Sequence, residues 1–492
     1  MTMPILAGFY PDPSICRVGE TYYLASSTFE YVPGVPIHRS TDLVAWELVG
    51  HALPDAEVID AGHTVADASG GIYAPTLRHH DGLFWMVTTS IRNAGPRGQL
   101  IVHSEDPAGP WSEPVYVPGT DGIDPDLAWT TDGRCLLTWC GHNPPAIYQV
   151  EIDPCTGERF TERRELWRGT EMKDTEGPHL FEKDGWWYLA VAEGGTFLGH
   201  GVSIARSRAP EGPFESNPAN PILTHRSIAH PVEATGHPDL VELADGSWAM
   251  VYLGIRRGGA FPGFHVNGRE TFIAGIDWVD GWPVVVEDRF EAVAGDRSWA
   301  DPFEDDALDG RWISPGHAPG SLVRRGDRGI VLSPGRAADA PEQAQVLCAR
   351  VTDADWEATA EVADGDACLS VRIDPLHWIG IERVGERLRV RAVSRPFDQV
   401  LAEAEAQPGD VLALRAVAAR QLYGRGGPDE LHAGVIRDGG FVGLGVVDGR
   451  YVSTEVAGGF TGRVLGIEAV GGPATVSRVT YTAIADDREV RA

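Results

Sequence analysis

The chain has 492 residues, with 71 acidic against 41 basic side chains and a formal net charge of -30. A chain of this length exceeds one ordinary core, so we expect two or three domains. Its negative charge would be repelled by phosphate backbones and anionic lipids, which excludes nucleic acid and membrane surfaces as preferred partners.

The N-terminal residues and the cysteines indicate the compartment. Residues 1–9 are apolar but lack the basic start, long hydrophobic region and cleavage site of an export signal. The six cysteines show neither the CxxC spacing of a zinc site nor the density of a disulfide framework. These features predict a soluble, cytoplasmic protein with reduced thiols.

A glycine turn followed by an aromatic-rich strand recurs five times in the first 295 residues. The copies begin at Gly19, Gly82, Gly133, Gly185 and Gly246. Their spacing of about 50 to 60 residues is typical of four-stranded propeller blades. The alternative is a set of sandwich hairpins, but five even copies favour radial repetition. We therefore predict an all-β protein in which residues 1–295 form a five-bladed β-propeller.

The repeat stops after the fifth copy, and charge and glycine content rise over residues 289–310. Further on, short alternating segments such as WEATAEVA and RVLGIEAV are separated by Gly and Asp turns. This pattern predicts a second domain over residues 300–488, a β-sandwich of the concanavalin-like jelly-roll type. Exposed faces of such a sandwich would suit a homo-oligomer.

Acidic residues stand at equivalent places in the repeat, at the start of the strand that would line the central channel. Asp12 and Asp124 share this register with His237, and Glu176 lies one residue earlier. One Asp before a strand is often only an Asx turn. Three acids aimed at one axis raise one another's pKa and would weaken a purely structural site. We therefore expect a functional site at one mouth of the channel.

Glycosidic bond cleavage is the chemistry that needs such a set of acids. One carboxylic acid protonates the leaving oxygen, while an opposed carboxylate activates water or attacks the sugar. A third carboxylate keeps the acid protonated at neutral pH. The sequence contains no GxSxG, HExxH or P-loop motif that would indicate a competing chemistry.

Several segments together resemble glycoside hydrolase family 43, and within it the two-domain β-xylosidase group: AGFYPDPSICRVGETYYLASSTFEY, TEGPHL, ATGHPDLVE and NGRETFIAGIDW. The resemblance implies that Asp12 is the general base and Glu176 the general acid. It assigns to Asp124 the orientation of that acid and the raising of its pKa. It also implies an inverting reaction, with a water between Asp12 and the anomeric carbon.

The same resemblance implies residues that bind the sugar. Arg269 in NGRET would contact substrate hydroxyls, Phe29 in STFEY would shape the pocket, and Phe460 in AGGFTG would bring an aromatic ring from the second domain. The competing interpretations are a surface arginine, core packing of Phe29 and an independent carbohydrate-binding role for the second domain. With Phe460 in place, the pocket would be a dead end suited to terminal sugars of small oligosaccharides.

His237 matches a family histidine near the channel axis, which in some members helps to hold a calcium ion through water. A lone histidine could equally hydrogen-bond Asp12. We expect no required cofactor, and a structural calcium ion near the axis stays an open alternative.

Two sites depart from the family pattern near the expected pocket. Tyr73 and Thr76 stand where most relatives have Trp and Asp, and His230 stands where Asn is usual. The first change shrinks an aromatic wall, in which Tyr73 would contact the sugar, and removes a carboxylate.

The first functional hypothesis is an exo-acting, inverting β-xylosidase that acts on xylo-oligosaccharides. An α-L-arabinofuranosidase or a bifunctional enzyme is the second. A non-catalytic sugar-binding propeller would not need the three acids together, and a retaining fructosidase would carry an Asn-Asp-Pro-Asn-like motif in place of Tyr-Pro-Asp-Pro.

Overall fold

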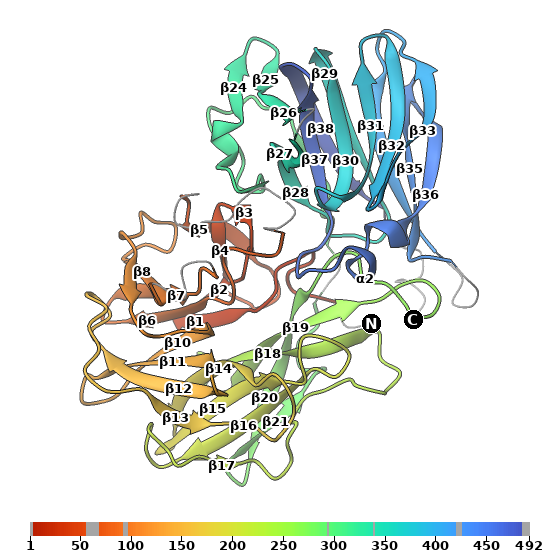
Figure 1. Ribbon diagram of the computed structural model, residues 1–492. Coiled ribbons are helices and arrows are strands. Elements are labelled where there is room, and N and C mark those ends of the chain that lie inside the picture. The colour runs from red at the N-terminus through yellow and green to blue at the C-terminus, as the bar shows by residue number, and fades with distance from the viewer. Residues whose placement is uncertain are drawn as a thin grey trace.

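The computed structural model describes residues 3–55, 68–91, 97–292, 295–337, 340–419 and 426–484. The described chain is almost entirely β-structure, which confirms the all-β prediction (Figure 1). Its one α-helix with a label, α2 (Thr454–Ala457), is a single turn. Within these ranges, no helix has the length and apolar character needed to cross a bilayer.

None of the six cysteines is paired in a disulfide. Residue 488, the expected end of the second domain, lies outside the described residues.

Five four-stranded antiparallel sheets follow one another along the first part of the chain (Figure 1). The first two sheets comprise β1 (Ser14–Val18), β2 (Thr21–Ala25), β4 (Gly34–Ser40) and β5 (Glu47–Leu53), then β6 (Thr76–His80), β7 (Leu83–Thr88), β8 (Gln99–Ser104) and β9 (Val115–Val117). The third comprises β10 (Ile123–Trp129), β11 (Cys135–His142), β12 (Pro145–Ile152) and β13 (Arg164–Trp167). The last two comprise β14 (Glu176–Lys183), β15 (Trp186–Glu193), β16 (Gly201–Ser207) and β17 (Glu215–Ser216), then β18 (Val232–Glu242), β19 (Trp248–Arg256), β20 (Glu270–Val279) and β21 (Trp282–Val286).

The five sheets close into a ring. The first strand of each sheet lies beside the first strand of the next sheet, and β18 lies beside β1. Strands then follow in chain order outward from this inner set. The equivalent positions of the repeat lie just before β1 and β6, at the start of β10 and β14, and in the middle of β18, and ring closure brings them to one region although they are far apart in the sequence.

The five glycines of the sequence repeat all lie in the hairpin that joins the two inner strands of a sheet. Each has a positive φ, between 64° and 86°: Gly19, Gly82, Gly133, Gly185 and Gly246. Glycine adopts this conformation at little cost because it has no Cβ atom, and such turns match the twist of paired strands. The repeat in the sequence is therefore a repeat of hairpins in the structure.

Two eight-stranded sheets are built from the C-terminal part of the chain. One comprises β22 (Trp299–Asp301), β24 (Val323–Gly326), β25 (Gly329–Leu332), β29 (Trp356–Asp364), β34 (Val411–Ala418), β35 (Asp429–Arg437), β36 (Gly440–Asp448) and β38 (Ala474–Ala483). The other comprises β26 (Pro334–Ala337), β27 (Ala340–Ala344), β28 (Leu347–Arg350), β30 (Ala367–Asp374), β31 (His377–Val384), β32 (Arg387–Ser394), β33 (Phe397–Glu405) and β37 (Val464–Val470). Buried side chains of both sheets, such as Ala358 and Ile379, pack in one apolar cluster, as expected for sheets stacked face to face.

A short strand pair joins the C-terminal part to the ring. Strand β23 (Ser314–Pro315) pairs with β3 (Tyr31–Val32), which lies in the connection between β2 and β4. Helix α2 makes a second connection to the ring. The backbone N–H of Thr454 donates to the carbonyl of His265 over 3.3 Å. In Figure 1, α2 lies where the C-terminal sheets meet the ring.

The segment that follows α2 approaches the ring backbone to backbone. A Cβ atom on Gly462 would lie 2.4 Å from the carbonyl carbon of Asn267, so only glycine fits there. The N–H of Arg463 donates to the carbonyl of Val266 over 2.8 Å. These contacts fix the position of Phe460, two residues before Gly462, against the first part of the chain.

Candidate active site

Four of the five inner strands carry the same backbone kink at the register position that the sequence repeat shares. The φ angles of Asp12, Asp124 and His237 are 55°, 57° and 52°, and that of Gly177 is 57°. In all four the next residue is proline. Left-handed conformations are costly for residues with a Cβ atom, and residues held in them cluster at functional sites. The four positions therefore share one backbone conformation, which is strained at Asp12, Asp124 and His237.

Gly177 shows why the acid of the fourth sheet stands one residue early. A Cβ atom at this position would lie 2.9 Å from the imidazole of His237, so the kink position itself must be glycine. Its N–H donates to Asp124 Oδ2 over 3.1 Å. The same oxygen lies 3.3 Å from His237 Nε2. Asp124 is thus held by Gly177 of the neighbouring strand and by His237. Glu176 is the residue immediately before Gly177 in the sequence, which places it next to this contact.

Asp12 is kept ionised by its neighbours. Burial alone would raise the pKa of its carboxyl, but the positive charges of Arg269 and His237 and a hydrogen bond from Ser27 lower the pKa below its ordinary value. Arg269 Nη1 donates to Asp12 Oδ1 over 2.9 Å, and the Ser27 hydroxyl donates to Asp12 Oδ2. The carboxylate is therefore the form present near neutral pH.

Glu176 has the opposite environment. Burial raises the pKa of its carboxyl to about 8, and the negative charges of Asp124 and Asp12 add to the effect against the charges of His237 and Arg269. The same acids outweigh burial at His237 and raise the pKa of its imidazole to about 9. The site therefore holds one carboxylate at Asp12 and one carboxylic acid at Glu176 at neutral pH.

Three aromatic rings from distant segments form a wall beside these acids. Phe29 and Phe460 stack with ring centroids 5.7 Å apart. Tyr73 meets both edge-on, at 5.5 Å and 6.0 Å. The guanidinium of Arg269 lies 5.6 Å from the Phe29 ring and 5.3 Å from the Phe460 ring. The backbone N–H of Phe460 donates to the hydroxyl of Ser69 over 2.8 Å, which anchors the wall.

Unpartnered polar atoms gather at the same place. Among the described residues, the buried atoms without a protein hydrogen-bond partner include Arg269 Nε, His237 Nδ1, Asn267 Oδ1 and both ring nitrogens of His200. Buried polar groups are normally paired, so such a group of orphans indicates room for water or a polar ligand. A polyol substrate would satisfy these atoms.

The surroundings of His237 leave one ring nitrogen for a water molecule. Its Nε2 faces Asp124, to which it is hydrogen-bonded in place of Asp12, and only Nδ1 is left for a further partner. Calcium takes six to eight oxygen ligands, so His237 would take part in a calcium site only through water bound at Nδ1. We derive no catalytic step from a metal at this position.

A second acid cluster lies two residues further along the inner strands, and the sequence analysis missed it. Arg78 Nη1 pairs with Asp239 and Arg78 Nη2 with Asp126, both at 2.7 Å. His179 Nδ1 lies 2.9 Å from Arg78 Nη2, and the Ser14 hydroxyl donates to Asp239 Oδ2 over 2.7 Å. The Asp at the third position of the Asp124-Pro125-Asp126 and His237-Pro238-Asp239 motifs was the available signal.

Two of the three departures from the family pattern, Thr76 and His230, lie apart from the three carboxylates. Thr76 occupies the register of Asp126 and Asp239, so the carboxylate that relatives carry there belongs to the second cluster. His230 lies against His225, with ring centroids 3.9 Å apart. Tyr73 alone of these positions contributes to the aromatic wall.

The comparisons with known proteins decide the family. A model of glycosyl hydrolases family 43 matches residues 1–283, which include the three carboxylates and Arg269. The chain belongs to this family. As a member of family 43 it is a glycoside hydrolase.

Relatives in family 43 carry two kinds of name. The chain is 35% identical to a non-reducing end alpha-L-arabinofuranosidase of Bacteroides ovatus, over 95% of this chain and 91% of the relative. It is 44% identical to a xylosidase/arabinosidase of Butyrivibrio fibrisolvens, over 57% of this chain and 56% of that one. Among solved structures, a Bacteroides ovatus xyloglucan-locus GH43B protein superposes with a TM-score of 0.87 at 32% identity, covering 98% and 100% of the two chains. A xylan beta-1,4-xylosidase of Bacillus halodurans superposes with a TM-score of 0.85 at 26% identity, over 98% and 100%.

Proposed function

We propose that this glycoside hydrolase removes terminal pentose units, with β-D-xylose as the first candidate, from short xylo-oligosaccharides by a single inverting displacement. One observation carries the proposal: the environment drives the pKa values of two nearby carboxyl groups apart. The pKa of Asp12 is lowered and that of Glu176 is raised to about 8. A base and an acid present together at neutral pH are what inverting hydrolysis requires.

In the proposed reaction, Asp12 accepts a proton from a water molecule as that water attacks the anomeric carbon. The bond from this carbon to the leaving oxygen breaks, and the oxygen takes the proton of Glu176. The reaction leaves Asp12 protonated and Glu176 ionised, and exchange of protons with solvent restores both. Asp124 supports the acid, because its negative charge disfavours ionisation of Glu176.

The remaining residues position the sugar. Nη1 of Arg269 donates to Asp12, whereas Nε has no partner within the protein. The guanidinium can therefore orient the proposed base and bind substrate hydroxyls at the same time. Phe29, Tyr73 and Phe460 offer apolar faces on which a pyranose or furanose ring can stack. A wall supplied partly by Phe460, from the C-terminal sheets, closes the pocket and favours removal of terminal sugars.

We also propose a more specific fold for each part of the chain. The five sheets are the blades of a propeller spanning residues 1–295, and the two eight-stranded sheets form a concanavalin-like jelly roll over residues 300–488. Ring closure through β18 and β1 supports the first assignment. Face-to-face packing of the two larger sheets supports the second.

An α-L-arabinofuranosidase is the second candidate, because relatives that match this chain carry that name and Tyr73 makes the aromatic wall smaller than a tryptophan would. The two sugars present similar sets of hydroxyls to one pocket. The test is the ratio of kcat/KM for aryl β-D-xylopyranoside and aryl α-L-arabinofuranoside. A preference for the xyloside supports the first candidate, and a preference for the arabinoside replaces it with the second.

Glu176→Gln, measured in parallel, ties the activity to the proposed acid. We expect kcat/KM to fall by about 10²–10⁴-fold on substrates with poor leaving groups, and less on aryl groups that leave without a proton. Equal losses on both kinds of leaving group would contradict the role of Glu176. Proton NMR of the first product should show the α-anomer from a β-xyloside; the β-anomer would exclude inversion.

A further inference from the structure

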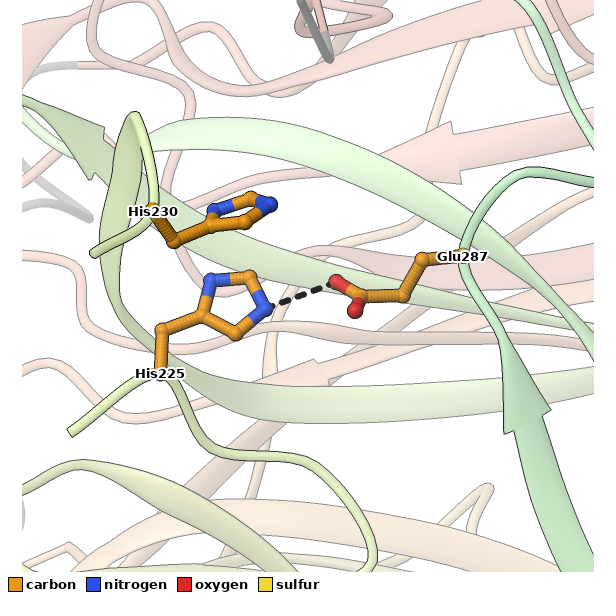
Figure 2. Close-up of side chains that lie close together, drawn as sticks. All are labelled: His225, His230 and Glu287. Atoms are coloured by element: carbon orange, nitrogen blue, oxygen red, sulfur yellow. Dashed lines mark hydrogen bonds and ion pairs between the residues drawn. The ribbon is translucent and has the colours of Figure 1, made fainter. Parts of the chain in front are cut away.

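Two histidines and a glutamate lie together beside the end of β21. His225 and His230 belong to the segment that precedes β18, and Glu287 directly follows β21. Figure 2 shows both imidazole rings directed toward the Glu287 carboxylate. One ligand atom from each of the three residues lies within 4.8 Å of the other two. The proposed hydrolysis uses none of these side chains.

Both rings are oriented by the same backbone carbonyl. His225 Nδ1 lies 2.7 Å from the oxygen of Val232. His230 Nδ1 lies 2.9 Å from that oxygen and accepts a hydrogen bond from the Val232 N–H over 3.1 Å, so His230 would release its Nε2 proton when it binds a metal. A histidine that donates from Nδ1 to a carbonyl keeps the lone pair on Nε2. Most metal-binding histidines are held in this way, with the second ring nitrogen bonded to a carbonyl or carboxylate.

Glu287 completes the arrangement from the other side. Its Oε1 lies 2.8 Å from His225 Nε2, and the Tyr252 hydroxyl donates to the same oxygen over 3.4 Å. The side chain of His225 is 2% exposed, whereas that of Glu287 is 34% exposed. The three ligand atoms are thus held from within the protein, and an ion can reach them from solvent on the glutamate side.

The geometry and the donor set fit one class of ion. A tetrahedral metal with bonds of about 2.0–2.1 Å holds its ligand atoms about 3.4 Å apart. The contact between His225 Nε2 and Glu287 Oε1, now 2.8 Å, would therefore open slightly to admit the ion, and all three ligand atoms already lie within 4.8 Å of one another. Imidazole nitrogen with one carboxylate suits zinc and neighbouring transition metals, whereas calcium and magnesium prefer oxygen ligands throughout.

We propose that His225, His230 and Glu287 bind one divalent transition-metal ion of the zinc class, with solvent as the fourth ligand. Such an ion clips the segment before the inner strand β18 to the end of the outer strand β21. It therefore stabilises the fifth sheet, and it is separate from the site that cleaves the glycosidic bond.

The test is zinc binding by tag-free protein that has been stripped with a chelator and dialysed. Calorimetric titration with zinc chloride should give one ion per chain, and zinc should raise the melting temperature. His230→Asn, which keeps a polar group near Val232, and Glu287→Gln should each weaken binding by at least about 10–100-fold, the range seen when only supporting residues are lost. Neither variant should then be stabilised by zinc.

Matched controls separate this site from other zinc ligands. His432 pairs with Glu430 at 3.3 Å, and among the described residues no third ligand joins them, so His432→Asn should bind zinc as the wild type does. Cys155, the exposed cysteine, should be dispensable in Cys155→Ser. Far-UV circular dichroism and the metal-free melting temperature check that each variant is folded.

The proposal is overturned if stripped wild-type protein binds no zinc, or if both folded site variants bind it as tightly as the wild type. It is also overturned if the His432 or Cys155 variant loses the binding. Binding of calcium in preference to zinc would overturn the assigned class of ion.

Discussion

The inner strands of the ring carry two clusters of buried acids, two residues apart in register, and the clusters differ in how their charge is balanced. Around Asp239 and Asp126, one guanidinium reaches both carboxylates at 2.7 Å. Backbone N–H groups complete the set, since Ile15 donates to Asp239 and Leu180 to Asp126. In the cluster of the three proposed catalytic acids, by contrast, polar atoms are left unpartnered and one carboxyl group keeps its proton.

The comparison shows that burial of acids does not by itself mark a catalytic site. Burial would raise the pKa of Asp239, but Arg78 and His179 lower it below its ordinary value, so this carboxylate is stably ionised. Glu176 meets the same kind of burial with further negative charge nearby, and its pKa rises to about 8. A satisfied cluster stabilises the fold, and an unsatisfied one is ready for a substrate.

The largest expected effect is on activity, from Asp12→Asn. Loss of the proposed base should lower kcat/KM on aryl xyloside by about 10²–10⁴-fold. The amide keeps the shape of the side chain but removes one partner of the buried ion pair with Arg269, so the free energy of unfolding should also fall, by about 3–5 kcal/mol. Urea denaturation measured beside the kinetics checks both parts, and retained activity would contradict the assignment of the base.

Asp239→Asn is the matched substitution in the second cluster, and its effect should be on stability. Removing one partner of a buried ion pair costs about 3–5 kcal/mol of unfolding free energy. Activity per folded molecule should stay within a few-fold of the wild type. The comparison between the two clusters fails if kcat/KM per folded molecule falls as far in Asp239→Asn as in Asp12→Asn.

Glu176→Gln should stabilise the protein at alkaline pH. The carboxyl has a pKa of 4.5 as the ordinary value and about 8 in the folded protein. Between these values the folded chain holds a proton that the unfolded chain has lost, so wild-type stability falls as pH rises from about 4.5 to about 8. Glutamine does not titrate. The variant should gain about 1–2 kcal/mol over the wild type across this window, less than the full shift because the side chain is partly exposed.

Melting temperatures of both proteins between pH 4 and pH 9 measure the gain. Asp239→Asn provides the control, because the pKa of Asp239 is lowered and its contribution is lost only as the solution becomes acidic. A melting-temperature difference for Glu176→Gln that stays constant with pH would contradict the raised pKa.

The smallest effect concerns the pH profile of Asp124→Asn. Wild-type kcat/KM should decline above about pH 8, as Glu176 loses the proton that it must donate. After burial, Asp124 makes the largest contribution to the raised pKa of Glu176. Its neutralisation should move the alkaline limb to lower pH by about half to one pH unit. A residue with a purely structural role would lower kcat without moving the limb.

The sequence predicted the features that repeat or that match a family motif. The five glycine turns and the register of Asp12 and Asp124 were visible because each sheet repeats them, and Phe460 was visible only through the family resemblance. The pairing of Arg78 with Asp239 was not, because these residues are 161 positions apart and no spacing rule connects them. The motif of His230 predicted a position near the pocket. Its contact with His225 and Glu287 could be seen only in the structure, because no sequence spacing connects Glu287 with the two histidines.

The position of Phe460 has a consequence for synthesis of the chain. A ribosome adds about 5–20 residues per second, so β21 is complete about 10 to 35 seconds before Phe460 is made. Throughout that interval a nascent ring can assemble its carboxylates while one wall of the pocket does not yet exist. The wall is completed when Gly462 packs against Asn267 and brings Phe460 into place. A chain released before that point would carry the acids of the site without the Phe460 ring.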